Sequence, residues 1–299
     1  MKKIIKAFRY IFTTPSVVLA YLWLKMSPFV PAKLYLTVMY RLKRGYWMDF
    51  KNPVKFNEKL QVLKLNEHNR EYIQMVDKYK VKFYVAKIIG NEYIIPTLGV
   101  WDRFEDINFE ALPNQFVLKC THDSGGIVIC KDKKTLNINE VKNKIKKSLS
   151  TNYYHIGKEW PYKYVRPRVI AEAYMEDEYG EFRDYKFFCF GGSVNFFKVD
   201  FGRFTEHHAN YYLPNGELLH FGEKNYPFDE NANLSLPCNL GKMIELAEKL
   251  SANIPFVRVD FYNCKGQIFF GELTFYPFSG FGSFSPEEWD NRIGEMLLI

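Results

Sequence analysis

The sequence has few cysteines and no long uncharged run, and these absences exclude two classes of protein. Five cysteines occur in 299 residues; they form no CxxC pair, and their odd number argues against a disulfide framework. The uncharged stretch between Arg9 and Lys25 counts 15 residues, whereas a membrane-spanning helix needs roughly 20. We therefore expect a cytoplasmic protein without a conventional membrane span.

Several signatures of nucleotide chemistry are also missing. The sequence has no GxxxxGK[ST] loop, no DxD metal motif, no nucleotide-sugar Rossmann domain and no recognised nucleic-acid motif. The composition, with 47% apolar and 18% aromatic residues, is that of a folded globular protein, and the net charge is +7. The basic excess favours anionic partners such as nucleotides, sugar acids or lipid headgroups.

The N-terminal residues 1–47 differ from the rest because four basic residues precede an apolar run over 17–24. Three interpretations stay open. The segment is a docked aromatic helical arm, a basic amphipathic segment lying on an anionic membrane, or an uncleaved signal or anchor.

The remaining chain alternates helical and strand patterns in an order typical of α+β proteins. Apolar residues about one turn apart predict helices over 56–89, and a further helix is predicted over 240–251. From residue 168 onward the chain is mostly strand-like, and Asn263-Cys-Lys-Gly266 reads as a hairpin turn. We expect an α+β fold with antiparallel sheets.

A first candidate site follows the strand that ends at Lys119, where Ser124-Gly125-Gly126 forms a loop before the next strand. Glycine lets backbone N–H groups approach an anion, and the lysine adds a positive charge. The alternative is a simple Gly-Gly turn beside a surface lysine.

A second candidate comprises Glu172, Asp184 and Lys186. Alternate residues of a strand share one face, so Asp184 and Lys186 point the same way. A charged pair on the buried side of a sheet is costly unless it is paired or used. An exposed cross-strand ion pair is the equally open alternative.

The third candidate is the predicted hairpin over 256–274. Arg258 and Asp260 share a face, as do Glu272 and Thr274. Two carboxylates close together in an aromatic sheet need a cation, and Mg²⁺ bridging phosphates meets that need. A solvated polar face of an edge hairpin is the alternative.

The order of these motifs resembles the ATP-grasp superfamily, in particular the branch named for the teichuronopeptide biosynthesis protein (TupA-like), which is associated with surface polysaccharide genes. The resemblance rests on the stretches FNEKLQVLKL, VDKYKVKFYV, FVLKCTHDSGG, DYKFFCFGG and FVRVDFYNCKGQIFFGELTFYPFSG. It implies an ATP-grasp fold whose antiparallel sheets form two lobes around a nucleotide cleft. The expected divisions are an arm over 1–47, a helical subdomain over 48–112, a small lobe over 113–175 and a large lobe over 176–299.

The resemblance also implies site residues. The nucleotide-binding set would be Lys119, Ser124, Gly125, Gly126, Glu172, Ala173, Tyr174 and Asp184. The residues acting on the transferred phosphoryl group or the substrate would be Arg258 and Lys186, and the Mg²⁺ ligands Asp260, Glu272 and Thr274. Many members of the superfamily carry asparagine where this chain has Thr274.

The implied reaction is ATP-dependent ligation of a carboxylate to an amine through an acyl phosphate, with ATP and Mg²⁺ as cofactors. The expected partners are an acidic sugar or polysaccharide carboxylate, an amino acid or amino alcohol, and the inner membrane face through the N-terminal arm. No nucleic acid is expected. The competing hypotheses are a transferase of the same pathway, such as a glycosyltransferase, a kinase using the same fold, and a non-catalytic glycan- or membrane-binding module.

Overall fold

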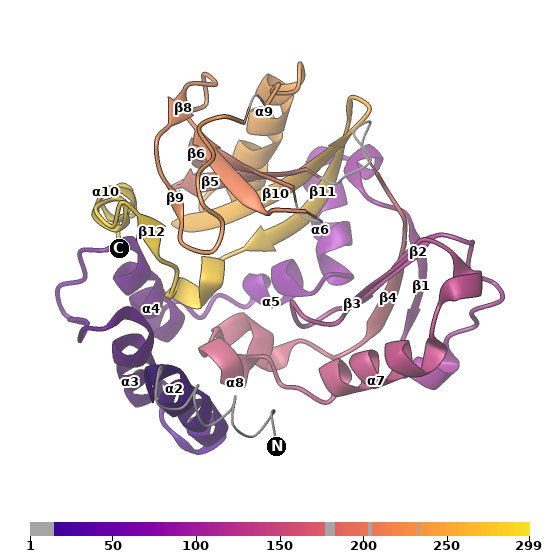
Figure 1. The fold of residues 1–299 in the computed structure, drawn as a ribbon, viewed down its shortest axis with the longest axis horizontal. Helices are drawn as coiled ribbons and strands as arrows, with labels where there is room; N and C mark the ends of the chain where they lie inside the picture. The colour runs from indigo at the N-terminus through magenta and orange to yellow at the C-terminus, as the bar shows by residue number, and fades with distance from the viewer. Residues whose placement is uncertain (1–14, 177–182, 203–204, 233) are drawn as a thin grey trace.

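The computed structural model describes residues 15–176, 183–202, 205–232 and 234–299 of the chain. They form an α+β fold with two main antiparallel sheets (Figure 1). Side chains from both sheets line a central pocket. The predicted fold class, two lobes of antiparallel sheet with an N-terminal helical arm, is confirmed.

The small sheet has the strand order β1-β4-β2-β3. Its strands are β1 (Thr97–Trp101), β2 (Phe116–Cys120), β3 (Ile127–Cys130) and β4 (Val169–Ala173). In β2 burial alternates, so that Phe116 and Leu118 enter the core beneath helix α7 (Ile138–Leu149). Lys119 therefore points to the other face of the sheet, toward the pocket.

The large sheet has the order β11-β10-β5-β6-β7-β8. Its strands are β5 (Asp184–Phe190), β6 (Ser193–Phe201), β7 (His208–Tyr212), β8 (Leu218–Leu219), β10 (Phe256–Cys264) and β11 (Gln267–Thr274), and a ribbon of β9 (Gly222–Glu223) and β12 (Phe284–Ser285) lies beside it. Helix α9 (Leu240–Ser251) packs on the sheet through a stripe at helical spacing, Met243, Leu246, Ala247 and Leu250. The strands are long because they are rich in aromatic and β-branched residues.

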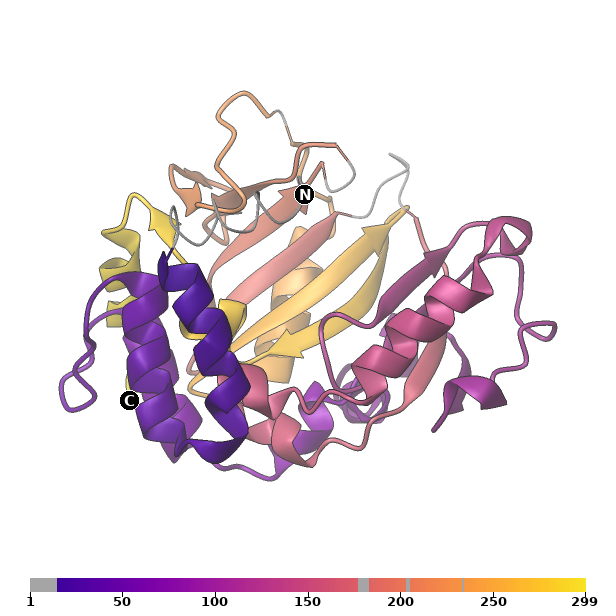
Figure 2. The same ribbon diagram turned by 60° about the horizontal axis from the view of Figure 1, so that its bottom comes forward.

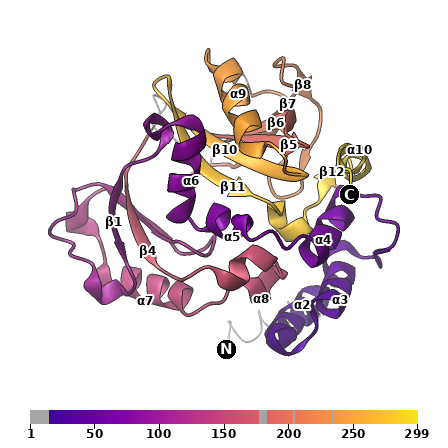
Figure 3. The same cartoon turned by 180° about the vertical axis from the view of Figure 1, so that it is seen from behind.

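Three further helices connect the N-terminal region to both lobes. They are α4 (Phe56–Asn66), α5 (Glu71–Val76) and α6 (Lys80–Ile89), and Figure 3 shows α5 and α6 between the small sheet and β11. The short helices α8 (Tyr154–Gly157) and α10 (Trp289–Met296) complete this side. The connection following α6 continues into β1, so the predicted helical subdomain also supplies an edge strand of the small sheet.

The N-terminal arm is helical over the part that the structure describes. Helices α2 (Pro15–Met26) and α3 (Ala32–Arg44) lie side by side at one end of the molecule (Figure 2). Helix α3 buries Tyr35, Leu36, Met39 and Tyr40. It ends at Arg44 and is capped by Gly45, whose φ of 87° suits a residue without Cβ. None of the described helices has the length and apolar character that crossing a membrane requires.

Candidate active site

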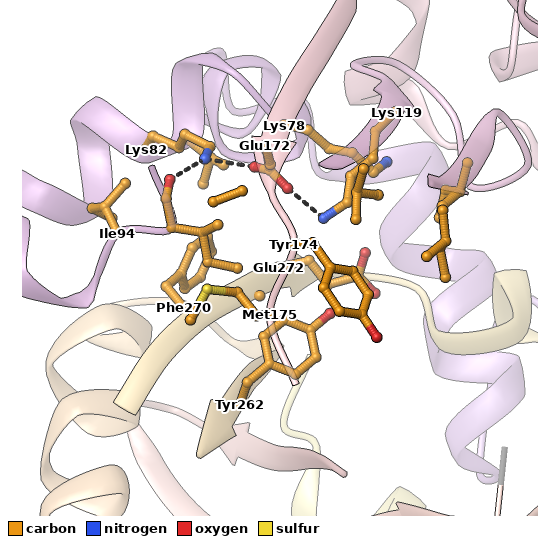
Figure 4. Close-up of a pocket in the computed structure, with 17 residues that line it drawn as sticks. Lys78, Lys82, Ile94, Lys119, Glu172, Tyr174, Met175, Tyr262, Phe270 and Glu272 are labelled. Atoms are coloured by element: carbon orange, nitrogen blue, oxygen red, sulfur yellow. Dashed lines mark hydrogen bonds and ion pairs between the residues drawn. The ribbon is translucent and has the colours of Figure 1, made fainter. Parts of the chain in front are cut away.

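A pocket of about 1140 Å³, part of it open to solvent, lies between the two sheets. Lys119 and Glu172 reach it from the small sheet, and Glu272 reaches it from β11 of the large sheet (Figure 4). Its remaining walls are mostly apolar: Val81, Ile94, Ile95, Val117, Ile127, Ile129, Ala173, Met175, Tyr262 and Phe270. A cleft with apolar walls and a few convergent charges is typical of a small-molecule site.

Glu172 lies at the centre of the small-lobe side of the pocket. Its carboxylate pairs with Lys82 Nζ and with Lys119 Nζ, each at 2.5 Å, and Lys82 also donates to the carbonyl of Ile95 at 2.6 Å. Burial would raise the pKa of Glu172, but the two lysines outweigh it and the pKa is lowered. The pKa of Lys82 is lowered because burial outweighs its carboxylate partner. The pocket thus carries two cations that share one anion.

Lys78, which precedes α6, brings a third ammonium group to the pocket (Figure 4). It donates to the backbone carbonyl of Asp123, at the start of the predicted phosphate loop. Burial lowers the pKa of Lys78, while Glu272 and Asp123 oppose the shift. The loop and the helical subdomain are therefore tied together at the pocket.

The loop after β2 has one packed and one open glycine. A Cβ on Gly126 would lie 2.3 Å from Ser148 Oγ, whereas a Cβ on Gly125 would meet nothing within 4 Å. Ser124 hydrogen-bonds Tyr153 through the two hydroxyls at 2.8 Å. Gly126 is thus required for packing on α7, and Gly125 leaves the backbone accessible.

The four polar residues of the β10–β11 hairpin come together as predicted. Arg258 Nε and Nη2 donate to the two carboxylate oxygens of Asp260 at 2.7 and 2.6 Å. Arg258 Nη2 also reaches Glu272 Oε1 at 3.0 Å and Thr274 Oγ1 at 3.1 Å. Thr274 Oγ1 in turn donates to Glu272 Oε1 at 3.0 Å, so all four side chains form one network.

The two carboxylates of this network have different protonation tendencies. Burial raises the pKa of Asp260 to about 6, although Arg258 opposes the shift. The pKa of Glu272 is lowered: burial would raise it, but Arg258, Lys78 and Lys186 have the larger combined effect. The Glu272 side chain is 45% exposed and that of Asp260 only 4%, so Glu272 is the carboxylate that a ligand meets first.

The predicted catalytic Lys186 lies beside Asp260 in the sheet, since the ladder pairs these two residues across β5 and β10. It is paired with Asp200 and lies 3.5 Å from Asp184. Lys198 follows in the next strand, opposite Lys186. A row of charged residues therefore crosses the sheet from Glu272 through Asp260 and Lys186 to Lys198. Asp184 lies two residues along β5, opposite Asp200, and neither Lys186 nor Asp184 belongs to the pocket wall.

The donor set fits a divalent cation by its oxygen chemistry and its charge. In the described part of the chain, no three acidic, histidine or cysteine side chains already form a metal cage. The face formed by β5, β6, β10 and β11, with the adjoining β9, nevertheless carries five carboxylates and three cationic groups. These are Asp184, Asp200, Glu223, Asp260, Glu272, Lys186, Lys198 and Arg258. An excess of buried carboxylates favours a hard cation with oxygen ligands.

The predicted residues divide into two groups. Those that line the pocket are Lys119, Glu172, Ala173, Tyr174 and Glu272. Those that lie outside its lining are Ser124, Gly125, Gly126, Asp184, Lys186, Arg258, Asp260 and Thr274. Asp260 and Arg258 nevertheless contact the pocket indirectly, because Arg258 bonds Glu272.

Sequence reasoning missed Lys78 and Lys82. Both lie in VDKYKVKFYV, a stretch that the resemblance had already singled out. On a predicted helix, lysines spaced four residues apart suggest a solvated face, but these two turn into the pocket. Their place in this stretch of the resemblance was therefore the signal that could have drawn attention to them.

The two-lobed sheets, the lysine-bearing strand and the acidic hairpin define an ATP-grasp protein. A family model described as TupA-like ATPgrasp matches residues 58–298, and the chain belongs to this family. A comparison with curated proteins found no match by sequence.

Solved structures with a similar arrangement include D-alanine–D-alanine ligase from Bacillus anthracis, with 16% identity and a TM-score of 0.40 over 74% of this chain and 59% of that one. D-Alanine–D-alanine ligase from Helicobacter pylori matches with 16% identity and a TM-score of 0.41, covering 82% of this chain and 70% of that one. L-Amino acid ligase from Bacillus licheniformis matches with 14% identity and a TM-score of 0.42, covering 75% of this chain and 49% of that one. The chain spans 59% of the Bacillus anthracis ligase.

Proposed function

We propose that this chain is an ATP-dependent carboxylate–amine ligase. One observation carries the proposal: the pocket has lysines on one lobe and a carboxylate network on the other, as a magnesium–nucleotide complex requires. Lys119, with Lys82 and Lys78, would hold the phosphates, and the apolar walls would hold the adenine. Ala173 and Tyr174, at the end of β4, would border the nucleoside. Ser124 and Gly125 would approach the phosphates from the loop.

In the proposed reaction a substrate carboxylate attacks the γ-phosphorus of ATP, and the bond to the β-phosphate oxygen breaks to release ADP. The acyl phosphate then reacts with an amine, which loses a proton and displaces inorganic phosphate to leave an amide. Mg²⁺ held by Glu272, Asp260 and Thr274 would offset phosphate charge. Arg258 would stabilise the transferred phosphoryl group. Lys186 would help to position the substrate on this face of the large sheet.

We further propose that the carboxylate belongs to a uronic acid of a capsular or other surface polysaccharide and that the amine is an amino acid or amino alcohol. Membership of the TupA-like family supports this substrate class, and aromatic side chains can stack on sugar rings. Such a reaction uses cytoplasmic ATP, so the enzyme would act in the cytoplasm or at the inner face of the membrane. Whether the acceptor is a monomer, a lipid-linked unit or a polymer decides how close it works to that face.

The test is thermal unfolding with Mg²⁺ and a non-hydrolysable ATP analogue, for the wild type and Asp260→Ala. Ligand at about 100 times its dissociation constant stabilises the native state by roughly 2.7 kcal/mol. We expect a magnesium-dependent rise in Tm that Asp260→Ala abolishes and that a distant variant, Asp290→Asn, retains. Phosphate release with uronic acids and amino acids then identifies the substrates. No rise for the wild type at millimolar nucleotide contradicts the proposal.

A further inference from the structure

Helix α2 is apolar on nearly all sides, although it lies at the surface. Lys25 is the single charged residue between Pro15 and Met26. One side of the helix packs on α3 through Ala20, Trp23 and Leu24. The side chains on its other faces and in the following connection are half-exposed or more: Val17, Leu19, Tyr21, Leu22, Met26 and Phe29. We call these six residues the arm face; a helix that is apolar all round is normally buried or in contact with lipid.

The net positive charge of the chain comes from the segment of sequence that contains this helix. Residues 1–48 hold nine of the 41 basic residues and none of the 34 acidic ones, and the rest of the chain holds 32 basic residues. The whole positive excess of the protein therefore lies in the arm. Lys25, Lys33 and Arg41 lie in the described part of the arm and are exposed, so they create a local positive potential next to the arm face.

The exposed basic residues of the arm lie against aromatic rings. Lys25 Nζ lies 5.3 Å from the ring centre of Tyr21, and the Arg41 guanidinium lies 6.0 Å from that of Trp47. Trp47 is 62% exposed and Phe29 82% exposed. Aromatic and basic side chains together on an apolar surface are typical of the boundary between lipid headgroups and acyl chains.

We propose that the arm face lies flat on an anionic lipid bilayer, with Lys25, Lys33 and Arg41 toward the headgroups. The described helices are too short to span a membrane, so the contact is peripheral. A second copy of the chain fits less well, because a two-fold contact would bring two basic arms together. This inference rests on the arm alone and does not depend on the proposed ligase activity.

The test is co-sedimentation of the full chain with vesicles of phosphatidylcholine alone or enriched in phosphatidylglycerol, at physiological ionic strength. We expect binding to the anionic vesicles only. Each of Lys25→Gln, Lys33→Gln and Arg41→Gln should weaken it about fivefold. Phe29→Ser and Leu22→Ser should each weaken it about tenfold, because inserted apolar area is lost.

Matched controls on other surfaces separate a specific face from general stickiness. Lys144→Gln and Lys147→Gln neutralise exposed lysines of α7, and Leu298→Ser removes an apolar side chain that is 84% exposed. These variants should bind as the wild type does. The proposal is overturned if the wild type does not co-sediment with anionic vesicles, or if the controls reduce binding as much as the arm variants. A dimer in solution that Leu22→Ser dissociates would also overturn it, since the arm face would then contact a second copy.

Discussion

Replacing Glu172 by glutamine removes the one negative charge that Lys82 and Lys119 share in the pocket. Both lysines lie 2.5 Å from its carboxylate, and their side chains are only 8% and 18% exposed. The variant keeps the shape of the side chain but leaves two neighbouring ammonium groups without their common counter-ion. Removing one partner of a buried ion pair destabilises a protein by about 3–5 kcal/mol.

We take the lower end, about 3 kcal/mol, because Lys119 keeps some contact with solvent. For a chain of 299 residues the unfolding entropy converts this loss into a fall in Tm of about 5 °C. The proposed nucleotide changes the sign of the effect: its phosphates supply the missing negative charge. We therefore expect Glu172→Gln to bind a non-hydrolysable ATP analogue with Mg²⁺ about tenfold more tightly than the wild type, a difference of about 1.4 kcal/mol.

Two measurements check this reasoning: unfolding without ligand, and titration of the analogue by calorimetry. Asp290→Asn is the matched control, because Asp290 is fully buried and pairs with Arg44 at 2.9 Å, outside the pocket. It should lose stability while binding nucleotide as the wild type does. A Glu172→Gln protein that is as stable as the wild type, or that binds nucleotide more weakly, would refute the assignment of the two lysines to phosphate.

Three further predictions concern the loop and the hairpin. Gly126→Ala should lower the free energy of unfolding by about 1–3 kcal/mol because its Cβ meets Ser148 Oγ; Gly125→Ala, whose Cβ meets nothing, should change it by less than about 0.5 kcal/mol in the same urea unfolding experiment. Asp260 keeps its proton up to about pH 6 when folded but loses it near 3.8 when unfolded, so its contribution to stability should fall by up to about 3 kcal/mol as the pH rises from about 4 to 6. The difference between wild type and Asp260→Asn across that range measures this, and a flat difference would contradict it. Thr274→Asn should tighten Mg²⁺ binding in the presence of nucleotide, measured by titration, because an amide oxygen is a better ligand than a hydroxyl; equal affinity would place position 274 outside the metal shell.

The fold class was predictable because its signals are local. Helical spacing, strand alternation and a hairpin turn are all written within short stretches of sequence. The order of the motifs resembles the ATP-grasp superfamily, and this resemblance predicted the two-lobed arrangement. The strand Thr97–Trp101 shows the limit: it joins the small sheet through pairing with β4, some seventy residues later, and no local pattern reports such a partner.

The same limit explains which pocket residues were missed. Lys119 was identified because it lies at the end of a strand and precedes a glycine loop. Lys82 was not, because a lysine on a helix looks solvated until its partner is known. That partner, Glu172, is 90 residues away, and the contact depends on how α6 packs against β4. Glu172 itself was expected beside the nucleoside, and its ion pairs with two lysines could not be read from the sequence.

The sequence analysis expected Asp260 and Glu272 to lie near one another in the hairpin, and they do, but only because of a bulge that the sequence pattern does not show. Cys264 pairs with Gln267 and Phe261 with Phe270; a regular ladder would continue by pairing Asp260 with position 271, leaving Glu272 on the opposite face. The structure has a bulge where the register shifts between Asp260 and Phe261, so Asp260 pairs with Glu272 instead. The extra residue is Gly271, and a Cβ there would lie 3.1 Å from the carbonyl oxygen of Asp260. Because Gly271 is the extra residue, Phe261 and Phe270 stay paired in the core while Glu272 turns to the same face as Asp260. The proposed metal site therefore depends on the bulge as much as on its ligands.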